Sequence, residues 1–343
     1  MFSGAQPGAT ICLAAGSYGT WSGGAKSGVV TVRGADGGGS RMQLSFGSSN
    51  NINVQGMTVT GGQINGSSKN ITVGNSNFTG LFLIETSTAN ANIVMDGNRH
   101  VNLDAPTSGL PARLTIWSSG KPSGVTVKNS YFSGGDADGV RPDADQVQVL
   151  NNEFADLVDK GVNHTDPIQL YGGTRAVIRG NYFHQDNGGN ISAYIMQADG
   201  GTGNVIENNV FGAVKGGAGS GHGVGYGITL LSDNGTIIQH NTWQQGVCDF
   251  SIPCGTLYLG NKSGAPVSKG TIIRDNVAGS ISGGGGTYTS DHNLWTSSSP
   301  GGVGDVRGTP SFVGPLTAYS GFYLSTTSAG RTTASDGGPV GIQ

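Results

Sequence analysis

A short motif that recurs along the chain constrains its fold more than any other feature of the sequence. The motif consists of two alternating β-formers, a turn residue, Asn or Gly, any residue, and then an aromatic residue. Its clearest copies are Thr72–Phe78, Thr126–Phe132, Gln148–Phe154, Val177–Phe183, Val205–Phe211 and Ile237–Trp243. One unit of this size cannot bury its own apolar side chains, whereas stacked units form a continuous core. The repeat therefore predicts a solenoid whose coils carry loops of different lengths.

A second set of short apolar segments lies between these motifs. The set comprises Leu81–Ile84, Arg113–Trp117, Gly139–Arg141, Pro167–Leu170, Tyr194–Gln197, Gly227–Leu230 and Thr256–Leu259. Each coil is therefore expected to contain at least two strands joined by Gly and Asn turns. The composition agrees, because 63 of the 343 residues are Gly and only 11% are charged. Since Gly opposes helix formation, this composition excludes a helical bundle.

The charge balance narrows the possible partners. The chain has 18 basic and 21 acidic residues and a net charge of -3, which gives no electrostatic footprint for nucleic acid or an anionic membrane. No apolar run approaches the roughly 18 residues that a membrane-spanning helix needs. No linker divides the sequence, so we expect one domain over residues 1–343 and a monomer.

Asparagine and aromatic residues recur at fixed places in the motif. The asparagines two places before the aromatic position are Asn152, Asn181, Asn209, Asn241, Asn276 and Asn293. Stacked about 4.8 Å apart, their amides can form a hydrogen-bonded ladder. We therefore interpret both the asparagines and the aromatic column as structural.

These motifs resemble the right-handed parallel β-helix superfamily of pectate-lyase-like proteins. Pro7–Leu13 and Gly16–Gly19 are similar to the first coil of that superfamily, and Pro310–Val313 and Tyr323–Ser325 are similar to a closing segment of secreted members. The resemblance implies an all-β, single-stranded right-handed parallel β-helix of about ten coils. It also implies a secreted protein that acts on or binds polysaccharide, although no cleavable signal is evident near residue 1.

Strand alternation predicts an outward-facing wall on the second strands of the coils spanning residues 132 to 262. With Val140, Ile168 and Met196 counted as inward, one outward column reads Arg141, Gln169, Gln197 and Thr229, and the column two places on reads Asp143, Tyr171, Asp199 and Leu231. Such polar side chains suit binding to sugar hydroxyls. Tyr171, Tyr194, Tyr226 and Tyr258 are candidates for stacking on sugar rings.

Two carboxylate pairs in these coils favour glycoside hydrolysis as the leading hypothesis. Asp138 and Asp166 are 28 positions apart, so they should be neighbours across one rung. Asp143 and Asp199 should lie two coils apart, roughly 9.6 Å at the backbone. An inverting glycosidase separates its carboxyls by about 6.5–9.5 Å and a retaining one by about 5–5.5 Å, so either pair could serve.

Polysaccharide β-elimination is the alternative hypothesis. A lyase acting on a uronic acid needs a base for the proton beside the carboxylate and a cation that neutralises the carboxylate. His164 or Lys160 with Arg141 could supply these groups. A second alternative is a non-catalytic adhesin or tailspike-like solenoid, because one fold serves many functions.

No cofactor is required by these readings. Asp136, Asp138, Asp143 and Asp145 offer oxygen ligands that a calcium ion could use, but they lack the spacing of a known calcium loop. Cys248 and Cys254 bracket a turn-like segment, and the sequence leaves open whether they form a disulfide.

Overall fold

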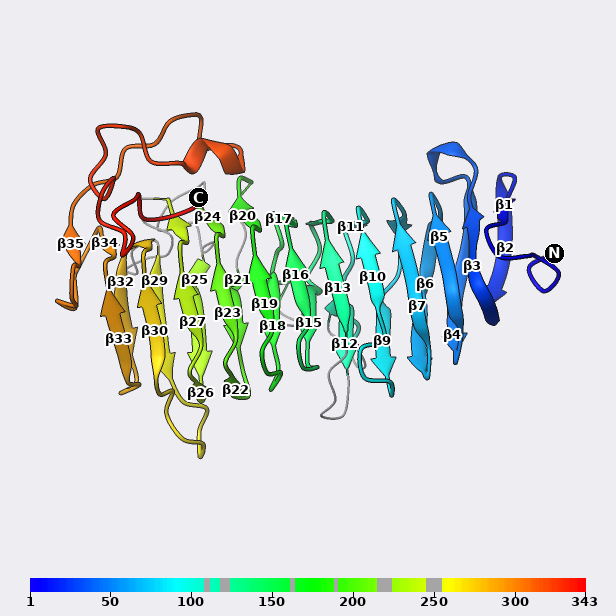
Figure 1. The fold of residues 1–343 in the computed structure, drawn as a ribbon, viewed down its shortest axis with the longest axis horizontal. Coiled ribbons are helices and arrows are strands. Elements are labelled where there is room, and N and C mark those ends of the chain that lie inside the picture. The colour runs from blue at the N-terminus through cyan, green and yellow to red at the C-terminus, as the bar shows by residue number, and fades with distance from the viewer. Residues whose placement is uncertain (108–111, 118–123, 161–163, 188–190, 215–223, 245–254) are drawn as a thin grey trace.

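The computed structural model shows a right-handed parallel β-helix whose coils follow one another along the long axis of the molecule (Figure 1). It describes all residues except 108–111, 118–123, 161–163, 188–190, 215–223 and 245–254. Cys248 and Cys254 therefore lie outside the described residues. Every pairing between named strands is parallel, which confirms the all-β solenoid predicted from the repeat.

One side of the β-helix is a twelve-stranded sheet, which we call sheet A. Its strands are β1 (Thr10–Cys12), β3 (Ala25–Arg33), β5 (Asn50–Gln55), β7 (Lys69–Gly74), β10 (Ile93–Asp96), β13 (Val125–Lys128), β16 (Gln148–Leu150), β19 (Val177–Arg179), β23 (Val205–Glu207), β27 (Ile237–Gln239), β30 (Thr271–Arg274) and β33 (Tyr288–Asp291). These twelve rungs exceed the ten or so coils expected from the sequence, because the first coils lack a full motif.

The other two sides branch from three shared strands in the first coils. These strands are β2 (Gly16–Trp21), β4 (Ser40–Gly47) and β6 (Thr58–Gly66). The aromatic side then continues with β8 (Asn77–Phe78), β11 (Arg99–Val101), β14 (Tyr131–Ser133), β17 (Glu153–Ala155), β20 (Tyr182–Gln185), β24 (Val210–Val214), β28 (Thr242–Trp243), β31 (Val277–Ala278), β34 (Leu294–Trp295) and β35 (Val306–Arg307).

The third side, which we call the site sheet, contains the second strand of each coil. Its strands are β9 (Phe82–Thr86), β12 (Ala112–Trp117), β15 (Asp138–Pro142), β18 (Ile168–Leu170), β21 (Ile191–Gln197), β25 (Val224–Leu231), β29 (Thr256–Gly260) and β32 (Ser280–Gly283). Two further short strands, β22 (Gly201–Thr202) and β26 (Asp233–Asn234), pair with each other, and two 3₁₀ turns are η1 (Asp36–Gly38) and η2 (Tyr319–Phe322).

The core confirms the predicted aromatic column and adds one member. Rings stack from coil to coil with centroids 4.3 to 5.0 Å apart. The column runs through Phe78, His100, Phe132, Phe154, Phe183, Phe211 and Trp243. His100 occupies an aromatic position, and burial, together with the charge of Arg113, lowers the pKa of its imidazole to about 3. It is therefore a neutral stacking ring at ordinary pH.

The asparagine ladder is also confirmed. Each asparagine accepts a hydrogen bond at Oδ1 from the backbone N–H of the preceding one, at 2.9 to 3.0 Å from Asn152 to Asn293. Each Nδ2 donates to a backbone carbonyl of the preceding coil, as Asn181 does to Val149 at 2.9 Å. Asp305 ends the ladder, because its Oδ1 accepts from the Asn293 backbone at 2.9 Å.

The C-terminal segment, residues 308–343, folds back over the aromatic side (Figure 1). Phe322 and Ile342 pack on Tyr182 and Val210, which face outward from that side. The backbone N–H of Ile342 donates to Thr242 Oγ1 at 2.9 Å. This segment therefore shields an apolar outer column from water.

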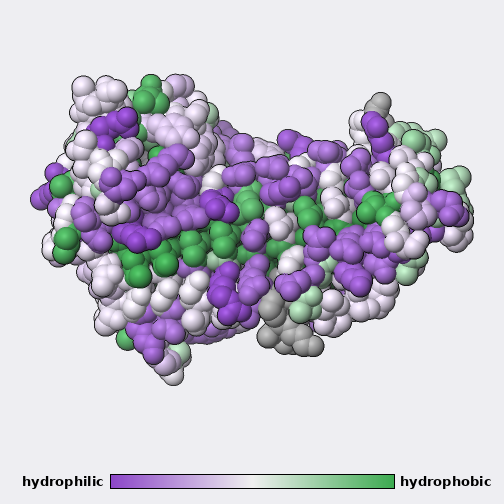
Figure 2. Space-filling model, viewed as in Figure 1, coloured by the Kyte–Doolittle hydropathy of each residue, from purple (hydrophilic) through white to green (hydrophobic). Residues whose placement is uncertain are grey.

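Sheet A keeps its outer face open, and Figure 2 shows a lengthwise hydrophobic band bordered by hydrophilic residues. The band follows Val177, Val205, Ile237 and Ile272, which are paired across successive coils. Beside it Arg179 and Glu207 form an ion pair at 3.3 Å. Among the described residues, no helix is long and apolar enough to cross a membrane.

Replacing Asn181 by Ala should lower the free energy of unfolding by about 1–3 kcal/mol, because the buried N–H of Asn152 and the carbonyl of Val149 each lose a partner. The exposed strand residue Asn77 is the control, and Asn77→Ala should change stability by less than about 0.5 kcal/mol. Urea unfolding followed by circular dichroism measures both. Equal effects of the two substitutions would contradict the structural role of the ladder.

Candidate active site

The register of the site sheet decides which predicted residues share one wall. Arg141 pairs with Thr115, Gln169 with Met196, and Val140 with Ile168. The outward column therefore runs through Thr115, Arg141, Gln169, Met196, Thr229 and Tyr258. Arg141 and Gln169 face outward as predicted, but the expectation that Met196 points inward is wrong.

Because Met196 faces outward, its neighbour Gln197 faces inward. It pairs with Leu170 and Leu230 and is fully buried. Its Nε2 donates to Asp233 at 2.8 Å, and its Oε1 accepts from Asn204 at 3.0 Å. The predicted role of Gln197 in binding sugar at the surface is therefore wrong, since its amide holds turns together inside the β-helix.

Asp138 and Asp166 do not form an exposed carboxylate pair. Both are fully buried. Asp138 Oδ1 accepts from the backbone N–H of Asp166 at 2.9 Å, and Asp166 Oδ1 accepts from that of Ala193 at 2.9 Å. The two carboxylates thus link three successive coils from within, because one oxygen of each accepts a backbone N–H of the following coil.

The second oxygen of Asp166 reaches the surface through His164. Asp166 Oδ2 lies 3.0 Å from His164 Nδ1, and His164 Nε2 lies 3.4 Å from Gln169 Nε2. The hydrogen bond with Asp166 raises the pKa of His164. Burial raises the pKa of Asp166, although its bond to His164 opposes that shift. The buried carboxyl therefore orients a half-exposed imidazole.

His164 forms one wall of a hollow of about 300 Å³ on the site sheet. The residues that line it are His164, Gln169, Tyr171, Ser192, Met196, Ala198, Leu231 and Lys262. Most of them come from β18, β21, β25 and the turns after β18 and β21, whereas His164 precedes β18 and Lys262 follows β29. Predicted residues His164, Gln169 and Tyr171 are brought together here, at the centre of the proposed wall.

Two cations flank the ring of Tyr171 at this hollow. The guanidinium of Arg141 lies 4.2 Å from the ring centroid, and Lys262 Nζ lies 5.5 Å from it. Lys262 also forms an ion pair with Asp199. Arg141 Nε lies 3.2 Å from Asp143 Oδ2. The arrangement places a phenol between two positive charges that carboxylates hold in position.

Asp143 and Asp199 have pKa values shifted in opposite directions. Burial raises the pKa of Asp143 to about 6, despite the opposing charge of Arg141. The hydrogen bond from Lys262 lowers the pKa of Asp199, and a bond from Tyr171 adds to this effect. Asp199 lies one position beyond the predicted column, because the register places Ala198, and not Asp199, beside Tyr171. Its side chain nevertheless reaches the wall.

The remaining predicted binding residues lie apart from the hollow or below the surface. Tyr194 is 2% exposed, and its hydroxyl donates to the Gly212 carbonyl at 2.8 Å, so the expectation that it stacks on sugar is wrong. Tyr226 is half-buried and packs against Tyr258 with ring centroids 5.1 Å apart. Lys160 does not line the hollow, because its Nζ pairs with Asp104 at 2.7 Å.

The four carboxylates considered for calcium point to separate partners. Asp136 Oδ1 accepts from the Ala105 backbone at 2.7 Å, and Asp145 Oδ1 accepts from the Thr174 backbone at 3.1 Å. Asp143 binds Arg141. No group of three or more His, Cys, Asp or Glu side chains converges in the part of the chain that the structure describes. The four carboxylates are therefore not gathered around one point, and calcium dependence stays a prediction to be tested.

Sequence reasoning missed Lys262 and Trp117. Lys262 lies in the turn after β29 and enters the site only because the turns of neighbouring coils stack. Trp117 ends β12, is 51% exposed, and pairs with Glu85 on the outer face. An aromatic residue at an outward strand position was the available signal for Trp117.

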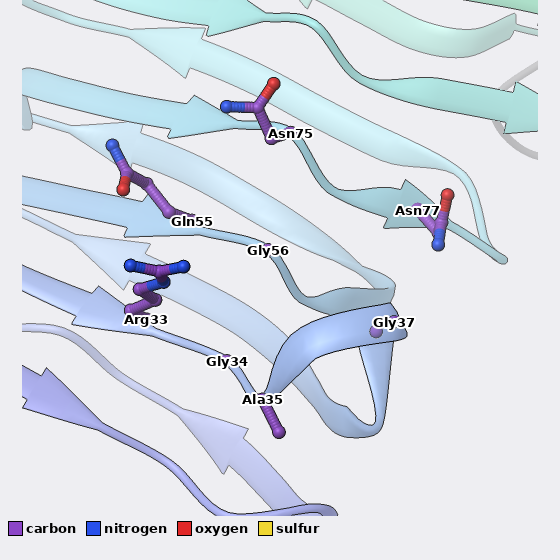
Figure 3. Close-up of a pocket in the computed structure, with 9 residues that line it drawn as sticks. Arg33, Gly34, Ala35, Gly37, Gln55, Gly56, Asn75 and Asn77 are labelled. Carbon is purple, nitrogen blue, oxygen red and sulfur yellow. The ribbon is translucent and has the colours of Figure 1, made fainter.

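A larger hollow of about 460 Å³ lies near the N-terminal coils (Figure 3). Arg33, Gln55 and Asn75 lie side by side at the ends of successive strands of sheet A, and the turn around Gly37 lies to one side of them. Neither a carboxylate nor an imidazole is among the described residues that line it. The described part of its lining thus differs from the hollow at Tyr171, where an imidazole lines the wall.

Comparisons with known proteins place the fold. No protein-family description and no curated protein matches the sequence. Among solved structures, the chain is similar to the PL6 family alginate lyase AlyGC, with a TM-score of 0.63 and 14% identity over 99% of this chain. This chain spans 56% of the length of AlyGC.

Two further structures have the same fold. A PL6 alginate lyase in complex with a trisaccharide gives a TM-score of 0.57 and 12% identity, over 99% of this chain and 88% of that one. PfbA, a surface adhesin of Streptococcus pneumoniae, gives 0.52 and 13% identity, over 84% of each chain. At these identities the comparisons show a shared right-handed parallel β-helix.

The carboxyl of Asp143 should titrate near pH 6 in the folded protein, because burial disfavours its charged form. Removal of the nearby cation by Arg141→Gln should move this pKa further upward, since Arg141 favours the carboxylate. Carbon NMR of the side-chain carboxyl measures both values. A downward shift in Arg141→Gln would contradict the assigned electrostatics.

Proposed function

We propose that this chain is a polysaccharide lyase that cleaves a uronic-acid polymer by β-elimination at the hollow beside Tyr171. The observation that carries the proposal is the placement of Tyr171 between Arg141 and Lys262, beside an imidazole oriented by a buried carboxyl. Elimination requires a base, an acid and a cation, and these residues supply all three.

Arg141 and Lys262 would neutralise the substrate carboxylate. Withdrawal of negative charge from that carboxylate acidifies the proton on the adjacent carbon, and fixed cations stabilise the charge that develops when the proton leaves. The contact of Arg141 with Asp143 is made through Nε, so its terminal amino groups are further donors in the guanidinium fork. Two cations on one phenol favour an acidic sugar over a neutral one.

His164 would act as the base. When Nδ1–H donates to Asp166, the neutral tautomer carries its lone pair on Nε2, the atom on the side of Gln169. Nε2 then takes the proton from the carbon beside the carboxylate. An imidazole whose second nitrogen is held by a carboxyl keeps the orientation and tautomer that proton transfer needs.

Tyr171 would act as the acid. As the carbon–hydrogen electrons form the new carbon–carbon double bond, the glycosidic carbon–oxygen bond breaks and the leaving oxygen takes the phenolic proton. The proton gained by His164 and the one lost by Tyr171 are exchanged with water after product release. Neither an oxidant nor a resident metal is needed for this balance.

The neighbours support an acidic substrate and make alginate the first polymer to test. AlyGC is described as an alginate lyase, and the second PL6 enzyme holds a trisaccharide. We also propose that the chain acts outside the cell, where such polymers occur. PfbA is described as an adhesin, so binding without turnover is an outcome the assays must detect.

Hydrolysis is the second candidate function, and one observation favours it. The environments of Asp143 and Asp199 push their pKa values apart, which is typical of an acid paired with a base in a glycosidase. In this reading Asp143 protonates the leaving oxygen and Asp199 activates water. The two candidates predict different products, since only a lyase leaves a double bond.

We expect the protein to release products that absorb in the ultraviolet from alginate or polygalacturonate. Tyr171→Phe and Lys262→Ala should each lower kcat/KM by at least about 100-fold, because they remove the acid and a cation. Lys160→Ala is the matched control for a lysine outside the hollow and should retain activity. If the products carry new reducing ends but do not absorb in the ultraviolet, and if Asp143→Asn abolishes their release, the protein is a hydrolase and not a lyase.

The pH dependence tests the base. His164 works when neutral, so kcat/KM should rise with pH through its raised pKa. In Asp166→Asn the amide can still accept from Ala193 N–H but no longer stabilises the imidazolium. The acid limb of the profile should therefore move to lower pH, and kcat should fall by about 100-fold or more. An acid limb that does not move in Asp166→Asn would show that His164 is not the base.

A further inference from the structure

An exposed tryptophan lies in line with the hollow, on the outer face of the same sheet. Ile116 pairs with Pro142, so the continued register places Trp117 beside Asp143, and Asp143 beside Tyr171. Asp143 N–H donates to the Ile116 carbonyl at 2.8 Å, which confirms that the register extends past the strand ends. Trp117 and Tyr171 are therefore two coils apart, about 9.6 Å along the axis.

The exposure of Trp117 is unusual for its position. It is 51% exposed, whereas Trp243 and Trp295 are fully buried and Trp21 packs between Phe2 and Phe46. A large aromatic surface left in water forgoes the stabilisation that burial would give, and exposed apolar patches often mark binding sites. The flat apolar face of a sugar ring is the kind of surface that an exposed indole can cover.

Aromatic side chains also lie on the other side of the hollow. Tyr258 is in the outward column of β29, three coils beyond β18, and packs against Tyr226. The hollow at Tyr171 is thus bracketed along the helix axis by Trp117 in one direction and by the Tyr226–Tyr258 pair in the other. A polymer lying along the axis would meet all three.

From this arrangement we infer that Trp117 forms a sugar-binding subsite, two coils from Tyr171, that stacks on a uronate ring of a chain bound along the helix axis. The inference rests on the proposed function, and it specifies the direction in which the substrate binds and how many coils it spans. The rise of one coil is comparable to the length of one hexose, so each coil accommodates about one sugar unit.

The subsite also marks the end of the binding surface. Glu85, on the next coil, is exposed and pairs with Trp117 in register. Its carboxylate would repel a further uronate, whereas Arg141 and Lys262 attract uronates at the hollow. Oligomers that extend from the hollow to Trp117 should therefore gain affinity, and still longer ones should gain little on that side.

The test compares kcat and KM of the wild type, Trp117→Ala and Trp117→Phe on oligouronates from the disaccharide to the octasaccharide. Trp117→Ala should raise KM about tenfold for the long oligomers, with little change for the disaccharide, and Trp117→Phe should recover most of the loss. Tyr288→Ala, which removes an exposed aromatic residue from sheet A, is the matched control. Thermal unfolding confirms that each variant is folded.

Intrinsic fluorescence gives an independent readout. Binding of a long oligouronate should shift the tryptophan emission of the wild type, and the shift should disappear in Trp117→Phe while calorimetry still detects binding. If the ratio of the KM of Trp117→Ala to that of the wild type does not depend on oligomer length, or if the emission shift persists in Trp117→Phe, the subsite is wrong. The proposed lyase activity is unaffected by either result. If no oligouronate is cleaved but the emission shift is present and depends on Trp117, the lyase activity is wrong and the subsite is supported.

Discussion

One buried amide in each coil from Asn152 to Asn293, hydrogen-bonded to the backbone of its neighbour, fixes the register on which the rest of this structure depends. In a parallel sheet a slip of one residue exchanges inward and outward side chains. The bonds from Asn152 to Asn181 and from Asn181 to Asn209 prevent that slip, because a displaced amide would leave buried N–H groups unsatisfied. Every wall of the β-helix, the site sheet included, inherits its alignment from this ladder.

The site sheet uses the same device with carboxylates. Asp138 and Asp166 accept backbone N–H groups of the following coil, whereas the asparagines accept those of the preceding coil. A carboxylate has a second oxygen, however, and that of Asp166 extends to His164. A group that first serves the stacking of coils thereby sets the orientation of an imidazole at the surface. The structural role of Asp166 and its role in the proposed mechanism are not alternatives, since the same side chain makes both contacts.

Most of the fold could be predicted because a repeat with stacked cores leaves a strong pattern in the sequence. Arg141, Gln169 and Tyr171 were placed on one wall because Val140 and Ile168 are separated by a full coil of 28 residues. The prediction failed one coil later, for Gln197, because Ile168 pairs with Ile195 after 27 residues. The length of the loops makes one coil a residue shorter than the other, and loop lengths do not follow the repeat of the strands. Lys262 was missed for the same reason, since only the stacking of turns brings it to Tyr171.

The two cations at Tyr171 differ in how firmly they are held. Arg141 and Asp143 are largely buried, so their contact is weakly screened and persists. Lys262 and Asp199 form a more exposed pair, and exposed pairs contribute little to stability because water screens them. In the proposed lyase, a substrate carboxylate would therefore displace Asp199 from Lys262 at little cost, while Arg141 stays in place beside the ring. Lys262 would then be the cation that moves with the substrate, and the uronate would take the place of Asp199 as its partner.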